Sequence, residues 1–281
     1  MKGWLAVGLV LAAMAPVSAD VVVLTPTRDN TIFDNGNSNG AGDAIFSGRT
    51  GDFGGQIVQR GLVAFRVAGS VPAGSTITSV SLELALVQTG AMGSPASHSL
   101  HRVLADWGEG ESIFPGGTGA PPTAGDATWD NTFFPDQFWL ATGGDYSPTV
   151  SASQTIGPAL GSYTWGSTPQ MVADVQIWLD IPSTPLGWLL MGDEVTPFSA
   201  KKFASREAVD SSLHPTLTIE FTPPPCPADC GDGDGIVAIV DFLALLGQSD
   251  AVGSSCDFGL GAQGVGIEEF LDLLANWGPC P

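Results

Sequence analysis

The chain has 281 residues, of which 43% are hydrophobic, so it is long enough for one large domain and a second small one. Its 29 acidic and 9 basic residues give a formal charge of −20, which excludes binding to nucleic acid or to anionic membranes, because both need a basic surface. The 37 glycines and 21 prolines follow no fixed period, which favours a turn-rich all-β protein over a collagen-like or disordered one.

Residues 1–19 predict a secretory signal peptide. Lys2 precedes an apolar run from Trp4 to about Ala15, and the run ends in the small-x-small sequence Val17-Ser18-Ala19. This run is shorter than the ~18 apolar residues that a membrane-spanning helix needs. We therefore expect an exported chain, extracellular or attached to the cell surface, with no membrane insertion.

Residues 20–222 predict a mainly β domain. Alternating apolar and polar residues occur in "QRGLVAFRVAG", "TITSVSLELALVQTG", "HSLHRVLADW" and "TLTIEF", and clusters of Gly, Pro, Ser and Asn separate these runs. One helix is predicted from Thr168 to Asp180, with Thr168 as its N-cap and Pro169 in its first turn. In the longest strand, five apolar residues are expected to face inward: Ile77, Val80, Leu82, Leu84 and Leu86.

Six motifs occur in a fixed order over about residues 26–222: "RDNTIFDNGNSNGAGDAIFSGRT", "RGLVAFRV", "SLHRVLADWGEGES", "GDATW", "YTWGS" and "FASREAVDSSLHPTLTIEF". Together they resemble the DNRLRE-type domain of bacterial secreted proteins. The resemblance implies a β-sandwich or jelly-roll. Related domains include carbohydrate-binding modules attached to polysaccharide lyases, so the resemblance also implies recognition of an extracellular polysaccharide.

Scarce basic side chains and clustered aromatic ones are the candidates for ligand contact. Arg60, Arg206 and Lys202 could bind the carboxylates of a uronic-acid polymer, or each could pair with a structural carboxylate. Trp107 and Trp139 belong to the aromatic-rich stretch 105–148 and could stack on sugar rings. Alternatively, this stretch folds over one end of the sandwich as a small core of its own.

A polysaccharide-degrading enzyme is the alternative function. The stretch "DWGEGES" offers an acid–base pair among Asp106, Glu109 and Glu111, which could equally bind a structural cation or cap a loop. His98 and His101 are expected on opposite faces of one strand, so strand geometry alone does not bring both to one site. The chain contains no G-x-S-x-G, H-E-x-x-H or Walker motif. We therefore assign no catalytic residue, and a ligand-free structural envelope protein is the third possibility.

The opening of this domain is rich in aspartate and asparagine. These residues could form a second calcium site on the sandwich, or they could serve turns; they are Asp29, Asn30, Asp34, Asn35, Asn37, Asn39 and Asp43.

A proline spacer, residues 223–225, precedes a different kind of segment. Residues 226–281 hold nine acidic residues and no Lys, Arg or His, and an offset of 28 aligns "DFLALLG" with "EFLDLLA". This duplicated loop–helix, running from "CPADC" to "GPCP", resembles the GC-type dockerin domain of planctomycete-like secreted proteins. The resemblance implies a small all-α domain that docks to a cohesin-like partner or serves as a surface-sorting tail.

The first loop of the repeat predicts a calcium site. A twelve-residue EF-type loop that ends at Asp241 has Asp232, Asp234 and the Ile236 carbonyl at positions 3, 5 and 7. Its first position is Cys230, but Asp229 lies next to it and could supply the carboxylate. In the second loop we expect no calcium, since only Asp257 and Glu269 are kept and positions 3 and 5 are Leu260 and Ala262.

The four cysteines are confined to this segment. An even number in a short exported segment predicts two disulfides, whereas zinc needs four close ligands and only the first two have a suitable spacing. Three connectivities are open. We pair Cys226 with Cys280, which flank the segment, and this leaves Cys230 with Cys256.

Overall fold

The computed structural model describes residues 19–72, 74–90, 95–185, 187–223, 226–249, 251, 254–257 and 264–280. Residues 1–18 of the predicted signal peptide, most of the proline spacer, and positions Leu260 and Ala262 lie outside these residues. Among the residues described, no helix is both long and apolar enough to cross a membrane.

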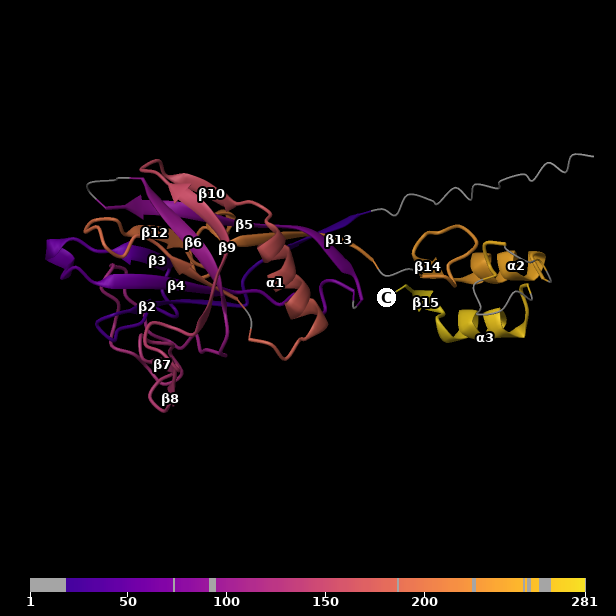
Figure 1. Cartoon of the computed structure of the whole chain (residues 1–281), viewed down its shortest axis with the longest axis horizontal. Helices are drawn as coiled ribbons and strands as arrows, with labels where there is room; N and C mark the ends of the chain where they lie inside the picture. The colour runs from indigo at the N-terminus through magenta and orange to yellow at the C-terminus, as the bar shows by residue number, and fades with distance from the viewer. Residues whose placement is uncertain are drawn as a thin grey trace, which may run out of the picture.

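The protein is mainly β, as predicted, and eleven strands form one curled antiparallel sheet (Figure 1). The strand order is β1-β13-β5-β12-β3-β4-β11-β6-β9, with β10 paired to β5 and β2 paired to β4. These strands are β1 (Asp20–Leu24), β2 (Arg28–Phe33), β3 (Ala44–Arg49), β4 (Val58–Ala64), β5 (Thr76–Thr89), β6 (Ala96–Val103), β9 (Tyr146–Ile156), β10 (Gly161–Trp165), β11 (Trp188–Met191), β12 (Lys201–Ala204) and β13 (Thr216–Thr222).

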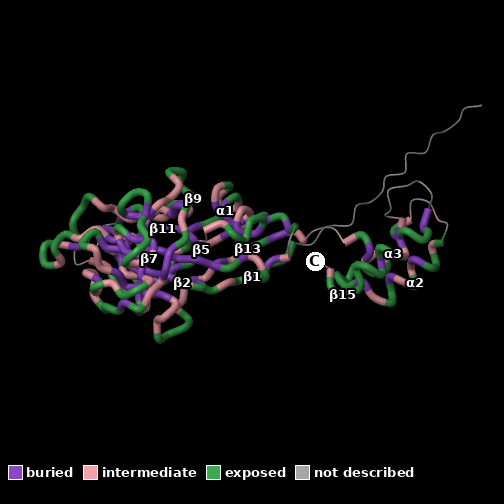
Figure 2. The backbone as a smooth tube through the Cα atoms, turned by 90° about the horizontal axis from the view of Figure 1, so that it is seen from below, coloured by how far each residue is buried: buried purple, intermediate pink, exposed green. Residues whose placement is uncertain are grey.

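Alternation of apolar residues fixes the register of the long strands. On β5, the five residues expected to face inward are all buried, and on β13 the same holds for Leu217, Ile219 and Phe221. These two strands pair over most of their length, so their apolar faces point to the same side of the sheet. Figure 2 shows the buried residues gathered inside the β-rich part.

The main core lies between the two halves of the curled sheet. It joins side chains of β5 and β13 to those of β4, β6 and β11, with Trp165, Trp178 and Trp188 fully buried in it. Strand β3 connects the halves because it pairs with β12 on one side and with β4 on the other. Helix α1 (Pro169–Asp180) closes one end of this core through Met171 and Val175.

The start of α1 agrees with the prediction. Thr168 is its N-cap, and the Thr168 side chain accepts a hydrogen bond from the backbone N–H of Met171. Pro169 occupies the first turn, where its missing N–H costs no intrahelical bond.

A second core covers the other face of the sheet. Leu62 and Ala64 of β4 face away from the main core and pack against Trp107, Trp139 and neighbouring residues of the aromatic-rich stretch. That stretch also carries the short hairpin β7 (Asn131–Phe133) and β8 (Gln137–Phe138). The stretch is therefore packed into a core, as in the second of the two interpretations given above, but it shares this core with a face of the sheet instead of closing one end.

The C-terminal segment repeats one helix. Helices α2 (Ile239–Gly247) and α3 (Ile267–Ala275) begin and end 28 residues apart, in agreement with the sequence offset. They contact each other through Phe242 and Phe270, whose ring centroids are 5.9 Å apart. The segment is not all-α, however, because β14 (Ile236–Val237) pairs with β15 (Gly278–Pro279).

Two disulfides close this segment, and both pairings agree with the prediction. Cys226 is bonded to Cys280 and Cys230 to Cys256, with Cα–Cα distances of 5.9 and 5.1 Å. The half-cystines pack around a small cluster of buried side chains that belong only to this segment: Ala228, Val237, Leu245, Cys256, Val265 and Leu273.

Candidate cation and ligand sites

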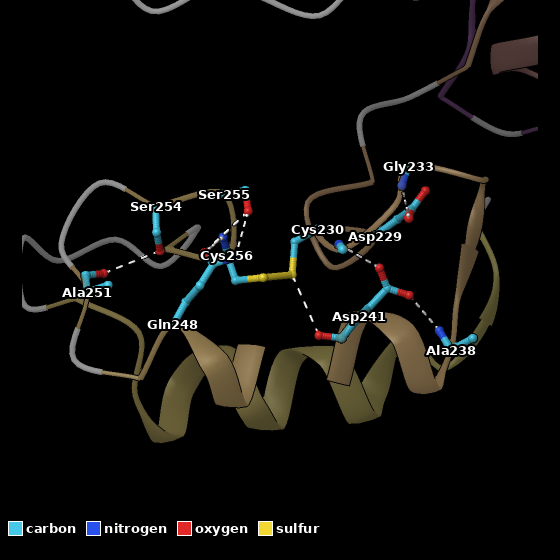
Figure 3. The surroundings of a disulfide bond; sticks show 11 residues. Asp229, Cys230, Gly233, Ala238, Asp241, Gln248, Ala251, Ser254, Ser255 and Cys256 are labelled. Carbon is cyan, nitrogen blue, oxygen red and sulfur yellow. Dashed lines mark hydrogen bonds between the residues drawn. A yellow bond between two sulfur atoms is a disulfide. The ribbon is translucent and has the colours of Figure 1, made fainter. Parts of the chain in front are cut away.

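Three carboxylates converge in the first loop of the C-terminal segment. Asp229, Asp232 and Asp241 each offer an oxygen, and these oxygens lie within 4.8 Å of one another. Figure 3 shows Asp229 and Asp241 beside the Cys230–Cys256 disulfide. Hard oxygen donors of this kind suit calcium, so the residues present fit the expected ion.

Backbone amides hold two of these carboxylates in place. Asp241 accepts hydrogen bonds from Gly231 N (2.9 Å) and Ala238 N (2.8 Å), while Asp229 accepts from Gly233 N (3.0 Å) and Gly235 N (2.7 Å). Burial works to raise the pKa of Asp241, but these amide contacts outweigh it and hold the pKa below its usual range. The Asp241 carboxylate is therefore kept ionised while it caps α2.

The loop uses Asp229 where the twelve-residue register would put Cys230. Cys230 is in a disulfide and offers no oxygen, whereas Asp229 lies in the carboxylate group. From Asp229 to Asp241 the loop is one residue longer than the twelve-residue form. Asp234 is not in the group; its Oδ1 accepts a hydrogen bond from Ile236 N at 2.8 Å.

Arg60 is held by other side chains of the β-rich part. Its guanidinium forms a two-point ion pair with Glu194, at 2.6 and 2.9 Å, and donates to the Gly143 carbonyl. Its Cζ atom lies 4.6 Å from the ring centroid of Trp129. Of the two roles considered for this arginine, the structure fits the pairing with a structural carboxylate.

Arg206 is engaged in the same way. Its Nε and a terminal nitrogen donate to the two oxygens of Glu109 at 2.8 and 2.7 Å, and Nε also lies 2.8 Å from Glu207 Oε1. Hydrogen bonding to Glu109 raises the pKa of Arg206. Glu109, a candidate acid of the alternative enzyme, is thus bound to a guanidinium, and Asp106 forms an ion pair with Arg28.

The two candidate stacking residues lie inside the second core. Trp107 is fully buried, and its ring faces the Arg28 guanidinium at 4.4 Å. Trp139 is buried and its Nε1 donates to the Thr128 carbonyl at 2.8 Å. A sugar ring needs an open aromatic face, so the structure does not support a stacking role for either tryptophan.

Lys202 lines a cavity of about 200 Å³ beside β3, β5 and β12. Its Nζ is 3.3 Å from Asp43, 3.3 Å from the Pro115 carbonyl and 5.7 Å from the ring centroid of Phe46. The cavity is also lined by Phe198, Gln59 and Gln88. Phe198 has a φ of 66°, which side-chain-bearing residues adopt at a cost.

Of the residues that line this cavity, the sequence singled out only Lys202 as a candidate for ligand contact. Phe46 and Phe198 are far apart in the chain and carry no motif, and only the pairing of β3 with β12 brings them to one place.

The three histidines make structural contacts. Nδ1 of His98 lies 3.2 Å from the Ala96 carbonyl, that of His101 lies 2.9 Å from the Ser147 carbonyl, and Nε2 of His214 lies 2.8 Å from the Ala208 carbonyl. His98 packs on Phe203 in the main core and His101 on Tyr146 in the second core, on opposite faces as expected.

The asparagines of the opening serve loop structure. Asn30 Nδ2 donates to the Glu109 carbonyl, Asn37 Nδ2 to the Thr118 carbonyl and Asn39 Nδ2 to the Ala44 carbonyl. The first two bonds tie the opening to the connection that follows β6, and the third closes the opening onto the start of β3. For these three asparagines the loop role is the explanation that fits.

No family model matches the chain, and no curated protein matches it by sequence. A function can therefore be argued only from the residues and from the geometry described above.

Proposed function

We propose that this chain is an exported, non-catalytic binding protein with two parts. Residues 20–222 form a DNRLRE-type β-sandwich that recognises an extracellular polysaccharide. Residues 226–281 form a GC-type dockerin-like module that attaches the protein to a cohesin-like or sorting partner at the cell surface.

The observation that carries this proposal is a repeated, exposed apolar face on α2 and α3. Side chains at the first, fifth and eighth positions of each helix lie on one face. They are 47–68% exposed, although they are apolar: Ile239, Leu243 and Leu246 on α2, and Ile267, Leu271 and Leu274 on α3. Exposed apolar surface of this extent, repeated at the sequence offset, supports a docking role.

The docking face can be tested with the mature full-length chain as bait. Leu243→Asp combined with Leu271→Asp is expected to abolish capture of a surface protein that the unaltered chain retains, because each change puts a charge into the apolar contact. Asn276→Asp adds the same charge at the exposed C-cap of α3, two residues beyond Leu274 and so turned away from the repeated face, and is expected to leave capture intact. Equal capture by all three proteins would contradict docking through this face.

Calcium in the first loop would stabilise the start of α2 in this proposal. Asp229, Asp232 and Asp241 would hold the ion, and their mutual repulsion would be relieved by it. Asp232→Asn is expected to weaken calcium binding at this loop, whereas Asp234→Asn, outside the carboxylate group, is the matched control. Isothermal titration calorimetry measures the calcium affinity of both variants. Equal losses of affinity in the two would contradict this ligand set.

The cavity beside Lys202 supports the polysaccharide-binding part of the proposal. It combines two aromatic walls, Phe46 and Phe198, with amide groups and the side chains of two lysines, Lys201 and Lys202. Amide and ammonium groups bind hydroxyls and carboxylates, and its volume of about 200 Å³ suits one sugar unit rather than a large ligand. We therefore expect a uronate residue of an acidic polymer to bind here.

A glycan array probed with the mature chain tests this part. Lys202→Gln is expected to remove binding to uronic-acid polymers, while Arg66→Gln, which removes one positive charge at another pocket, is expected to preserve it. No binding to any glycan would favour the ligand-free structural protein. Release of reducing ends or unsaturated uronates, abolished by Glu109→Gln, would instead favour the polysaccharide-degrading enzyme.

A further inference from the structure

A second group of three carboxylates lies in the β-rich part. Asp29 is on β2, Glu109 is in the connection after β6, and Glu207 follows β12; their oxygens lie within 4.8 Å of one another. Asp29 and Glu109 are also joined directly, because Asp29 N donates to Glu109 Oε1 at 2.8 Å. The three segments are far apart in the chain and meet only here.

Two oxygens of this group are buried without a partner among the residues described: Asp29 Oδ1 and Glu207 Oε2. Asp29 itself is fully buried. The other oxygen of each residue is engaged by Arg206, whose backbone N–H donates to Asp29 Oδ2 at 2.8 Å and whose Nε lies 2.8 Å from Glu207 Oε1. A buried carboxylate oxygen that lacks a donor is costly unless a ligand satisfies it.

The charges in this group do not balance. Three carboxylates face one guanidinium, that of Arg206, which leaves an excess of two negative charges around the fully buried Asp29. Burial raises the pKa of Asp29 well above its usual range and also raises that of Glu207. One divalent cation held by one oxygen of each carboxylate would neutralise the excess.

We propose that Asp29, Glu109 and Glu207 bind a hard divalent cation of the Ca²⁺ type, at a site separate from the loop of the C-terminal segment. All the side-chain donors are carboxylate oxygens, and no imidazole or thiolate belongs to the group, which disfavours zinc and copper. Ca²⁺ accepts carboxylates in irregular geometry, whereas Mg²⁺ demands a near-octahedral set.

The bound cation acts as a clamp. It ties β2 to the connection after β6 and to the segment after β12, and Arg206 completes the same junction from the side. Because the connection after β6 carries Trp107 and the rest of the second core, loss of the cation is expected to loosen that core.

Equilibrium dialysis of the metal-stripped, mature full-length chain against Ca²⁺ tests the proposal. The unaltered chain is expected to bind one more Ca²⁺ per molecule than Glu207→Gln and than Asp29→Asn. Glu111→Gln is the matched control, because Glu111 is an exposed acid of the same connection outside the group. Near-UV circular dichroism at 20 °C establishes that each variant is folded before its Ca²⁺ is counted.

The result does not depend on the C-terminal loop. Asp232→Asn takes one carboxylate from the group in that loop and none from the group in the β-rich part, so a chain carrying Asp232→Asn is expected still to lose one Ca²⁺ when Glu207→Gln is added. If Glu207→Gln and Asp29→Asn both bind as much Ca²⁺ as the unaltered chain, the proposal is overturned and a proton rather than a cation offsets the excess charge. If only Asp232→Asn lowers the number of Ca²⁺ ions bound per chain, the C-terminal loop binds Ca²⁺ and the site at Asp29, Glu109 and Glu207 does not exist.

Discussion

His98 is a fully buried histidine of β6 whose protonation opposes folding. Its Nδ1 lies against the Ala96 carbonyl, its Nε2 has no hydrogen-bond partner among the residues described, and its ring meets Phe203 edge-on. Burial lowers the pKa of His98 from 6.5 to about 4, and the positive charge of Lys201 acts in the same direction. The folded protein therefore keeps this ring neutral at pH values where the unfolded chain is protonated.

The free energy of unfolding is expected to fall as the pH drops from 6.5 towards 4. In this window the unfolded state binds the proton and the folded state does not, so acid favours unfolding; the pKa difference corresponds to roughly 3 kcal/mol. Urea unfolding at several pH values, compared with His98→Gln, isolates the contribution, since the variant lacks this proton. Parallel pH profiles for the two proteins would show that His98 is not the group responsible.

Individual residues were the hardest scale to predict from the sequence. Residue type showed that Arg60 and Arg206 need anionic partners, but not that Glu194 and Glu109 would supply them from 134 and 97 residues away. Likewise, the sequence does not show whether a tryptophan in a loop is exposed or buried. Trp107 is buried because its loop folds back over β4.

Secondary-structure elements were more predictable, because the periods of their apolar residues are local. The alternation of apolar residues predicted the bounds of β5 to within about one residue. The N-cap, the first-turn proline and the apolar spacing did the same for α1. The repeat in the C-terminal segment likewise placed α2 and α3. The spacing of apolar residues does not show which other elements a helix or strand packs against. In α1 these contacts depend on one polar residue, Asp174.

Asp174 is the polar anchor of α1, although it lies on the buried face of the helix. Its Oδ2 accepts a hydrogen bond from Trp188 Nε1 at 3.0 Å and one from Ser151 Oγ, while Oδ1 is 3.2 Å from Arg102 Nε. It thus joins the helix to β9, β11 and β6. The helical period puts Asp174 on the face of Met171 and Trp178, but it does not show which donors the buried carboxylate meets there.

Asp174→Ala is expected to destabilise the protein by at least about 3 kcal/mol, because it leaves the Arg102 charge and two buried donors without their acceptor. Asp180→Ala, an exposed aspartate on the same helix, is the control and is expected to change stability by less than about 0.5 kcal/mol. Urea unfolding followed by tryptophan fluorescence measures both. Similar losses in the two variants would contradict the anchoring role.

At the scale of the whole molecule, the two parts are stabilised by different means. The β-rich part has a large core, whereas the C-terminal segment buries a few side chains around its cysteines. A segment of this size has too little core to be stable without a covalent or metal cross-link. Sequence composition predicted this division, since every cysteine lies after the proline spacer.

The disulfides are expected to contribute more to the C-terminal segment than calcium does. They join residues 54 and 26 positions apart, and closing loops of these lengths in the unfolded chain is worth about 3–4 kcal/mol each. The first loop, by contrast, offers an ion only three carboxylates, and two of them, Asp229 and Asp241, are already held by amide hydrogen bonds.

Dithiothreitol is therefore expected to abolish the helical far-UV circular dichroism of α2 and α3, while EGTA alone leaves most of it. In the same samples the near-UV tryptophan bands report mainly on the β-rich part, which holds six tryptophans, whereas the C-terminal segment holds only Trp277. Because the β-rich part has no cysteine, dithiothreitol should leave most of these bands intact. A segment that unfolds with EGTA but resists dithiothreitol would show instead that the ion, and not the disulfide pair, maintains the structure of α2 and α3.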